Sequence, residues 1–166
     1  MTETPPPRRA LRLAALPLLT LLAGAPAALP AQTAPPLDLA TYPRTQLTVR
    51  PQSSPGKTLT FNVWVADTPE RAEQGLMFVR DLPESMGMVF PLAPPRVENM
   101  WMKNTYIELD MLFVGSDGKV TKIIERAHPL SLDTLSSDKP VSAVVELRGG
   151  AVAHLGLKVG DRVSWK

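Results

Sequence analysis

Cysteine is absent from the 166-residue sequence. This absence excludes disulfide bonds, thiol catalysis, thiolate metal sites and cysteine-based redox roles. It also excludes the usual bacterial lipid anchor, which requires a cysteine to acylate. The fold therefore has to be stabilised mainly by its hydrophobic core.

An excess of charge of one sign is also lacking. The chain carries 18 basic and 16 acidic residues; three of the basic residues and one of the acids precede Gln32, which leaves 15 of each beyond that point. Proteins that bind nucleic acids or anionic membranes rely on a one-sided electrostatic field, which this balance does not supply. We therefore expect no nucleic-acid partner.

Signals for common enzyme classes are scarce. The two histidines, His128 and His154, stand singly, whereas a catalytic histidine needs an orienting partner. The glycines between residues 149 and 160 precede no long helix, so they favour turns between short strands over a phosphate-binding loop. The sequence predicts no cofactor.

The N-terminal segment has the layout of a secretory signal peptide over residues 1–31. Three arginines precede an apolar stretch at residues 13–22, and small residues follow. A retained membrane anchor is disfavoured because proline and glycine interrupt a stretch already short for a bilayer. We expect cleavage after Ala31, with Ala27 as the second candidate. The mature protein would be exported to the periplasm or cell envelope of a bacterium, with no integral membrane segment.

Residues 32–45 are rich in proline and poor in large apolar side chains, which predicts a disordered tether. Residues 46–166 then form one domain, dominated by strand-like alternation of apolar and polar residues. Residues 68–75 differ: Thr68 can cap a helix, Pro69 suits its first position, and Gly75 can end it. Asp117 and Gly118 predict a hairpin turn. The fold class is mainly β, an antiparallel sandwich or partly open barrel with one short helix.

The stretch "ENMWMKNTYIELDMLFV", residues 98–114, places polar groups in an apolar run. Asn tolerates a left-handed backbone, so a turn at Asn104 would allow Lys103 to face Asp110. In one interpretation Asp110 is a structural residue partnered by Lys103, Arg80 or backbone donors. In the other, these residues form a pocket.

The motifs "GLM", "GM-F", "WMKNT" and "LD-F", followed by "VVELRGG", resemble the DUF192 family from about Thr58 to Val163. The resemblance implies a compact β-rich domain, often exported or anchored in prokaryotes, with no settled activity. It makes a functional surface at the polar motif residues as plausible as a purely structural network. These residues are Arg80, Lys103, Asn104, Asp110 and Glu146.

The leading functional hypothesis is a non-catalytic binding or interaction module of the cell envelope. A few polar groups in an apolar frame are typical of a ligand site. The expected partner is a small polar or anionic ligand, or an envelope component. The candidate ligand-binding residues are Arg80, Trp101, Lys103, Asn104, Asp110 and Glu146.

Two alternatives remain open. The first is a hydrolase of envelope polymers that uses Asp110 and Glu146 as a carboxylate pair. The second is a copper site, because six of the seven methionines fall between residues 77 and 111 and thioethers suit Cu(I). Methionine is also a common core filler, so no metal site is predicted as the main function.

Overall fold

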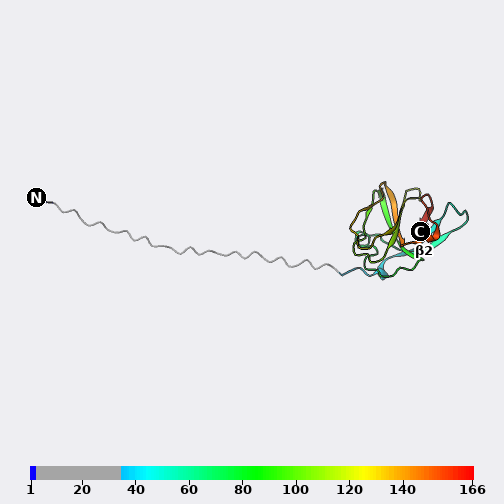
Figure 1. Ribbon diagram of the computed structural model, residues 1–166, viewed down its shortest axis with the longest axis horizontal. Helices are drawn as coiled ribbons and strands as arrows, with labels where there is room; N and C mark the ends of the chain where they lie inside the picture. Colours follow the sequence, from blue (N-terminus) through cyan, green and yellow to red (C-terminus); the bar gives the residue numbers. More distant parts are fainter. Residues whose placement is uncertain (3–34) are drawn as a thin grey trace. The chain divides into compact units, whose positions relative to one another are not determined.

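The computed structural model describes residues 1–2 and 35–166 (Figure 1). The expected signal peptide, apart from its first two residues, and residues 32–34 of the expected tether lie outside the described residues. None of the helices in the described part of the chain is long and apolar enough to span a bilayer.

Seven strands form one curled sheet in the order β6-β5-β8-β3-β2-β1-β9. Its two edges approach each other where Lys119, beside β6, bridges Arg162 of β9. The prediction of a mainly β fold is therefore confirmed. The strands are β1 (Arg44–Arg50), β2 (Leu59–Val65), β3 (Met86–Arg96), β5 (Leu109–Val114), β6 (Val120–Ala127), β8 (Val141–Arg148) and β9 (Arg162–Trp165). A separate two-stranded ribbon pairs β4 (Asn99–Met100) with β7 (Leu135–Ser136).

Two features depart from the expected antiparallel sheet with one helix. First, β2 and β3 pair in parallel. Parallel neighbours need a crossover connection, and here the crossover contains the expected short helix, α1 (Pro69–Gln74). Second, a further helix, α2 (Ala151–Leu155), occupies a region expected to contain only turns and strands.

The local signals for α1 and the hairpin are confirmed. The side chain of Thr68 accepts a hydrogen bond from the Arg71 amide, Pro69 begins the helix, and Gly75 follows it with φ 50°. In the hairpin before β6, Gly118 has φ 76° and its amide donates to the Gly115 carbonyl. A positive φ favours glycine at both positions.

The ordered domain begins earlier than residue 46. A single 3-10 turn, η1 (Leu39–Thr41), is capped by Asp38. Tyr42 behind it is buried, and β1 starts at Arg44. Tyr42 packs in an apolar cluster of the sheet, a contact that its proline-rich neighbours did not predict.

The sheet buries a separate apolar cluster on each face. The inner cluster takes residues from all seven strands and from α2; it includes Leu47, Phe61, Val89, Leu112, Val145 and Val163. The outer cluster takes residues from β2, β3, β5, β6 and β8 and from the loops that cover them; it includes Trp64, Leu82, Met88, Met102, Met111 and Val144. Strands β5 and β8 are therefore buried on both faces, which explains their nearly continuous apolar sequences.

Candidate functional site

A cleft of about 510 Å³ opens beside α1, on the outer face of the sheet. We call it the α1 cleft. One wall is the end of α1 and the turn after it, another is the C-terminal half of β3, and a third is the segment that begins at β4. It is lined by residues 66–69, 72–77, 90–93, 96, 98–101, 105 and 146.

Glu146 is the most buried ionisable residue that lines the α1 cleft. It is 4% exposed and lies in the middle of β8, paired with Met88 of β3 on one side and Met111 of β5 on the other. Paired residues point to the same face of a sheet, so the carboxyl is flanked by two apolar thioether side chains. Burial raises the pKa of Glu146 to about 8, because the charged form loses its hydration there.

One carboxyl oxygen of Glu146, Oε2, is also left without a hydrogen-bond partner. Among the described residues, three buried side-chain polar atoms have none: Glu146 Oε2, the Trp64 indole nitrogen and the Tyr42 hydroxyl. All three belong to the outer face, but only Glu146 lines the α1 cleft. An unsatisfied buried polar group costs free energy, and a ligand that hydrogen-bonds to Glu146 would remove that cost.

Asp110 plays a different role, although it too is buried, at 0% exposure. One carboxylate oxygen accepts hydrogen bonds from the amides of Arg126 and Gly150, and the other accepts from the amide of Val152 at 2.7 Å. These bonds hold the start of α2 against the sheet. The partner is therefore a set of backbone donors, and neither Lys103 nor Arg80.

Asp110 and Glu146 lie on opposite faces of the sheet. In the pairing of β5 with β8, Asp110 is opposite Leu147 and Met111 is opposite Glu146. Leu147 belongs to the inner cluster and Met111 to the outer one. Two carboxylates separated by a sheet cannot act on one glycosidic bond, so this geometry removes the basis for the expected hydrolase pair.

The "WMKNT" motif forms the outer wall of the α1 cleft. Trp101 is 43% exposed and lines the cleft, as does the buried Thr105. The Lys103 ammonium lies 4.8 Å from the centroid of the Trp101 ring, which is a cation–π contact. Lys103 does not line the cleft, so it contacts the Trp101 ring from outside the cleft. It is not the partner of Asp110, whose oxygens bond to backbone amides.

Asn104 makes the turn that this arrangement needs. Its φ is 54°, which confirms the left-handed backbone expected there. Its carbonyl accepts a hydrogen bond from the Phe78 amide, and its side-chain amide donates to the Met77 sulfur at 3.9 Å. Asn104 therefore ties the Trp101 wall to the turn after α1.

Arg80 belongs to a second hollow, of about 390 Å³, which we call the Arg80 pocket. It shares this pocket with Glu108, Arg126 and Arg148, and its guanidinium lies 4.7 Å from the Tyr106 ring centroid. Since neither Trp101 nor Glu146 lines the Arg80 pocket, the expected ligand site between Arg80, Lys103 and Trp101 is not a single site.

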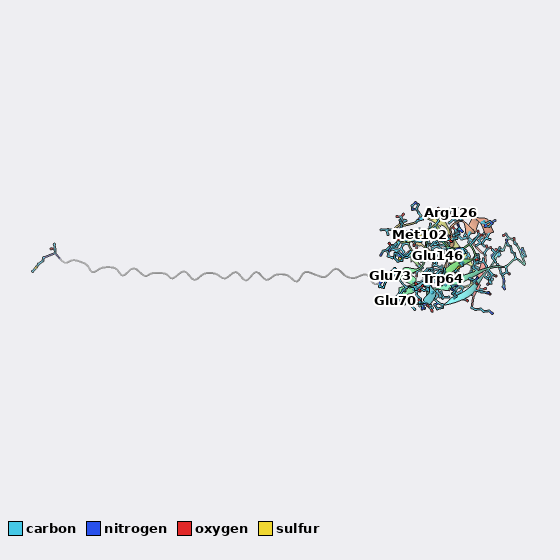
Figure 2. The ribbon with its side chains drawn as sticks, turned by 90° about the horizontal axis from the view of Figure 1, so that it is seen from below. Trp64, Glu70, Glu73, Met102, Arg126 and Glu146 are labelled. Atoms are coloured by element: carbon cyan, nitrogen blue, oxygen red, sulfur yellow. The ribbon has the colours of Figure 1, made fainter. Side chains whose placement is uncertain are left out.

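The acidic rim of the α1 cleft is the part that the sequence did not indicate. Figure 2 labels Glu146 in the middle of the domain, and Glu70 and Glu73 at its edge. Glu73 lines the cleft together with Asp67 and Glu98. The sequence signals for this segment were helix-capping signals, so they indicated α1 but not the surface beside it.

The family model for DUF192, described as "Uncharacterized ACR", matches residues 51–165. The chain belongs to the DUF192 family. The resemblance noted in the sequence is therefore confirmed. A search of curated proteins gave no significant match.

Two solved structures resemble this DUF192 chain, each with a TM-score of 0.72. One, from Sinorhizobium meliloti, is described as a "putative transcription regulator"; it is 40% identical, and the match covers 75% of this chain and 95% of that one. The other, a protein of unknown function from Novosphingobium aromaticivorans, is 36% identical over 86% of this chain and 94% of its own. Both matches support the fold without assigning a function to it.

Proposed function

We propose that this DUF192 protein is an exported, non-catalytic binding module that holds a small polar ligand in the α1 cleft. The observation that carries the proposal is Glu146, which lines the cleft and whose Oε2 atom has no hydrogen-bond partner. Ligand sites are typically apolar hollows with a few polar groups placed in them. The α1 cleft has a mixed lining, in which the apolar side chains Phe90, Leu92 and Trp101 stand beside Glu146 and other polar groups.

A binding role is favoured over catalysis by the arrangement of the acids. Glycoside hydrolysis usually requires two carboxyl groups on either side of the scissile bond. Two other acids of the described residues are buried, Asp110 and Asp161, and the oxygens of both are occupied by backbone amides. Glu146 is then the one buried acid among the described residues that lines the cleft, which suits recognition by hydrogen bonding.

The binding proposal is tested by ligand-induced thermal shifts across a metabolite and glycan panel. Hits should lose their shift in Trp101→Ala and Glu146→Gln, because both residues line the α1 cleft. The same hits should keep their shift in the matched control Arg80→Ala, since Arg80 lines the other pocket. Hits that respond equally in all three variants would contradict the proposal.

Export is a separate part of the proposal and rests on the signal-peptide pattern of residues 1–31. Determination of the N-terminus on protein from the native host should find Gln32 after cleavage at Ala31, or Ala28 after cleavage at Ala27. An intact Met1 on the envelope protein would overturn it.

A further inference from the structure

The α1 cleft carries more acidic than basic side chains. Of the described residues, four acids line it: Asp67, Glu73, Glu98 and Glu146. One basic residue, Arg96, lines it too, and its guanidinium is paired with Glu98 at 2.8 Å. Among the described residues the cleft therefore offers an anionic ligand no unpaired cationic side chain.

No cationic side chain of the described residues is placed to meet Glu146. On its own sheet face its neighbours are Met88 and Met111, and the end of α1 approaches it through Gly75. The charged groups of the surrounding elements lie elsewhere. Arg71 of α1 pairs with Asp67, Arg96 at the end of β3 pairs with Glu98, Lys103 lies against Trp101 outside the cleft, and Asp110 of β5 is on the opposite face.

The remaining walls of the cleft are also compatible with a cation. The Trp101 ring makes a cation–π contact with Lys103. This contact uses one face of the ring and leaves the other face for a ligand. Met77 and Met100 add polarisable sulfur atoms to the lining. Aromatic rings beside carboxylates are a recurrent way of binding organic ammonium groups.

We propose that the ligand of the α1 cleft is an organic cation with a primary ammonium group, which hydrogen-bonds to the carboxylate of Glu146 while its body lies against Trp101. This inference rests on the proposed binding function and specifies its ligand class. A primary ammonium is favoured because it can donate hydrogen bonds to the Glu146 carboxylate, which a quaternary ammonium cannot do.

Binding is accompanied by release of a proton. In the empty cleft Glu146 is a neutral acid at pH 7, because burial raises its pKa to about 8. When the ammonium enters, the carboxyl gives its proton to solvent and becomes the carboxylate that pairs with the ligand. Affinity should therefore increase with pH until Glu146 is ionised in the free protein as well.

The test compares three probes of similar size and different charge by isothermal titration calorimetry: 2-phenylethylammonium, 2-phenylethanol and 3-phenylpropionate. Titration in buffers of different ionisation enthalpy counts the protons released. The ammonium should bind most tightly and release about one proton per ligand near pH 6, falling to about half near pH 8. The N-trimethylated ammonium should bind more weakly than the primary one.

Two variants locate the effect. Glu146→Gln should weaken ammonium binding by about tenfold or more and abolish the proton release, since it removes a charged hydrogen-bond acceptor. The control Glu125→Gln removes the same charge from an exposed position of β6 and should bind like the wild type. Far-UV circular dichroism confirms that both variants are folded.

The outcomes separate the cation inference from the binding proposal. If the alcohol binds as well as the ammonium and both lose affinity in Glu146→Gln, the cleft is a binding site but the cation inference is overturned. The cation inference is also overturned if ammonium binding is unchanged in Glu146→Gln, or if no proton is released. If none of the probes binds with a Kd near 1 mM or tighter, the cation inference is overturned, while the binding proposal is decided by the metabolite and glycan panel.

Discussion

Glu146 should make the stability of the unliganded protein decrease as pH rises. Its carboxyl has a native pKa of about 8, against 4.5 for the same group without burial. Below about pH 4.5 the group is protonated in both the native and the unfolded state. Between the two pKa values the native state retains a proton that the unfolded state has lost, which favours unfolding.

The expected magnitude follows from this window. The free energy of unfolding should fall by about 1.4 kcal/mol for each pH unit between the two pKa values. From about pH 4.5 to pH 7 the loss amounts to about 3 kcal/mol, which is a substantial part of the stability of a small domain. Above about pH 8 the contribution of Glu146 no longer changes.

Glu146→Gln isolates this contribution because glutamine has a similar shape and does not titrate. Urea unfolding of both proteins at several pH values should show the variant gaining about 3 kcal/mol relative to the wild type between pH 4.5 and pH 7. Other titrating groups cancel in the difference, and Glu125→Gln should show no comparable gain. Unfolding and refolding during purification removes any bound ligand beforehand.

A difference that stays constant with pH would refute the reasoning, because it would mean that Glu146 is ionised in the native state. A difference of the opposite sign would imply a cationic partner in the folded protein. Addition of 2-phenylethylammonium should flatten the pH dependence, since the ligand stabilises the ionised form of Glu146.

Three further predictions concern the sheet and the methionines. Asp110→Ala should lower the free energy of unfolding by about 3 kcal/mol or more in urea, because three backbone amides lose their acceptor; a loss below about 1 kcal/mol would contradict its structural role. Gly87→Ala should destabilise by about 3 kcal/mol in the same assay, since a Cβ there would collide with the backbone of β8; near wild-type stability would contradict this packing. After anaerobic loading with Cu(I), elemental analysis should find no stoichiometric copper, because the two methionines of the cleft, Met77 and Met100, are too few soft ligands. One bound copper per chain would support the metal hypothesis instead.

The correct part of the fold prediction came from residues that act on their near neighbours in the sequence. Thr68, Pro69 and Gly75 indicated α1 because capping and termination depend on residues within one or two turns. The Asp117-Gly118 turn was predictable for the same reason. The mainly β class followed from the alternation of apolar residues, which depends only on the strand repeat.

Non-local pairing accounts for the parts that the sequence did not reveal. The parallel pairing of β2 with β3 is decided by the route of the connection between them. The helix α2 depends on Asp110, which accepts the amide hydrogens of Gly150 and Val152 from 40 and 42 residues away. No window of sequence around residues 149–156 contains that acceptor.

The same reasoning explains why Asp110 and Glu146 looked alike in the sequence and differ in the structure. Each is a single acid in a strand whose apolar residues are buried on both faces. Alternation along β5 and β8, together with their register, puts the two carboxyl groups on opposite faces. On the inner face the start of α2 supplies amide donors, whereas on the outer face the end of α1 leaves a cleft. A buried acid whose partners come from its own fold is structural; one that faces a cleft without a partner is the better candidate for ligand recognition.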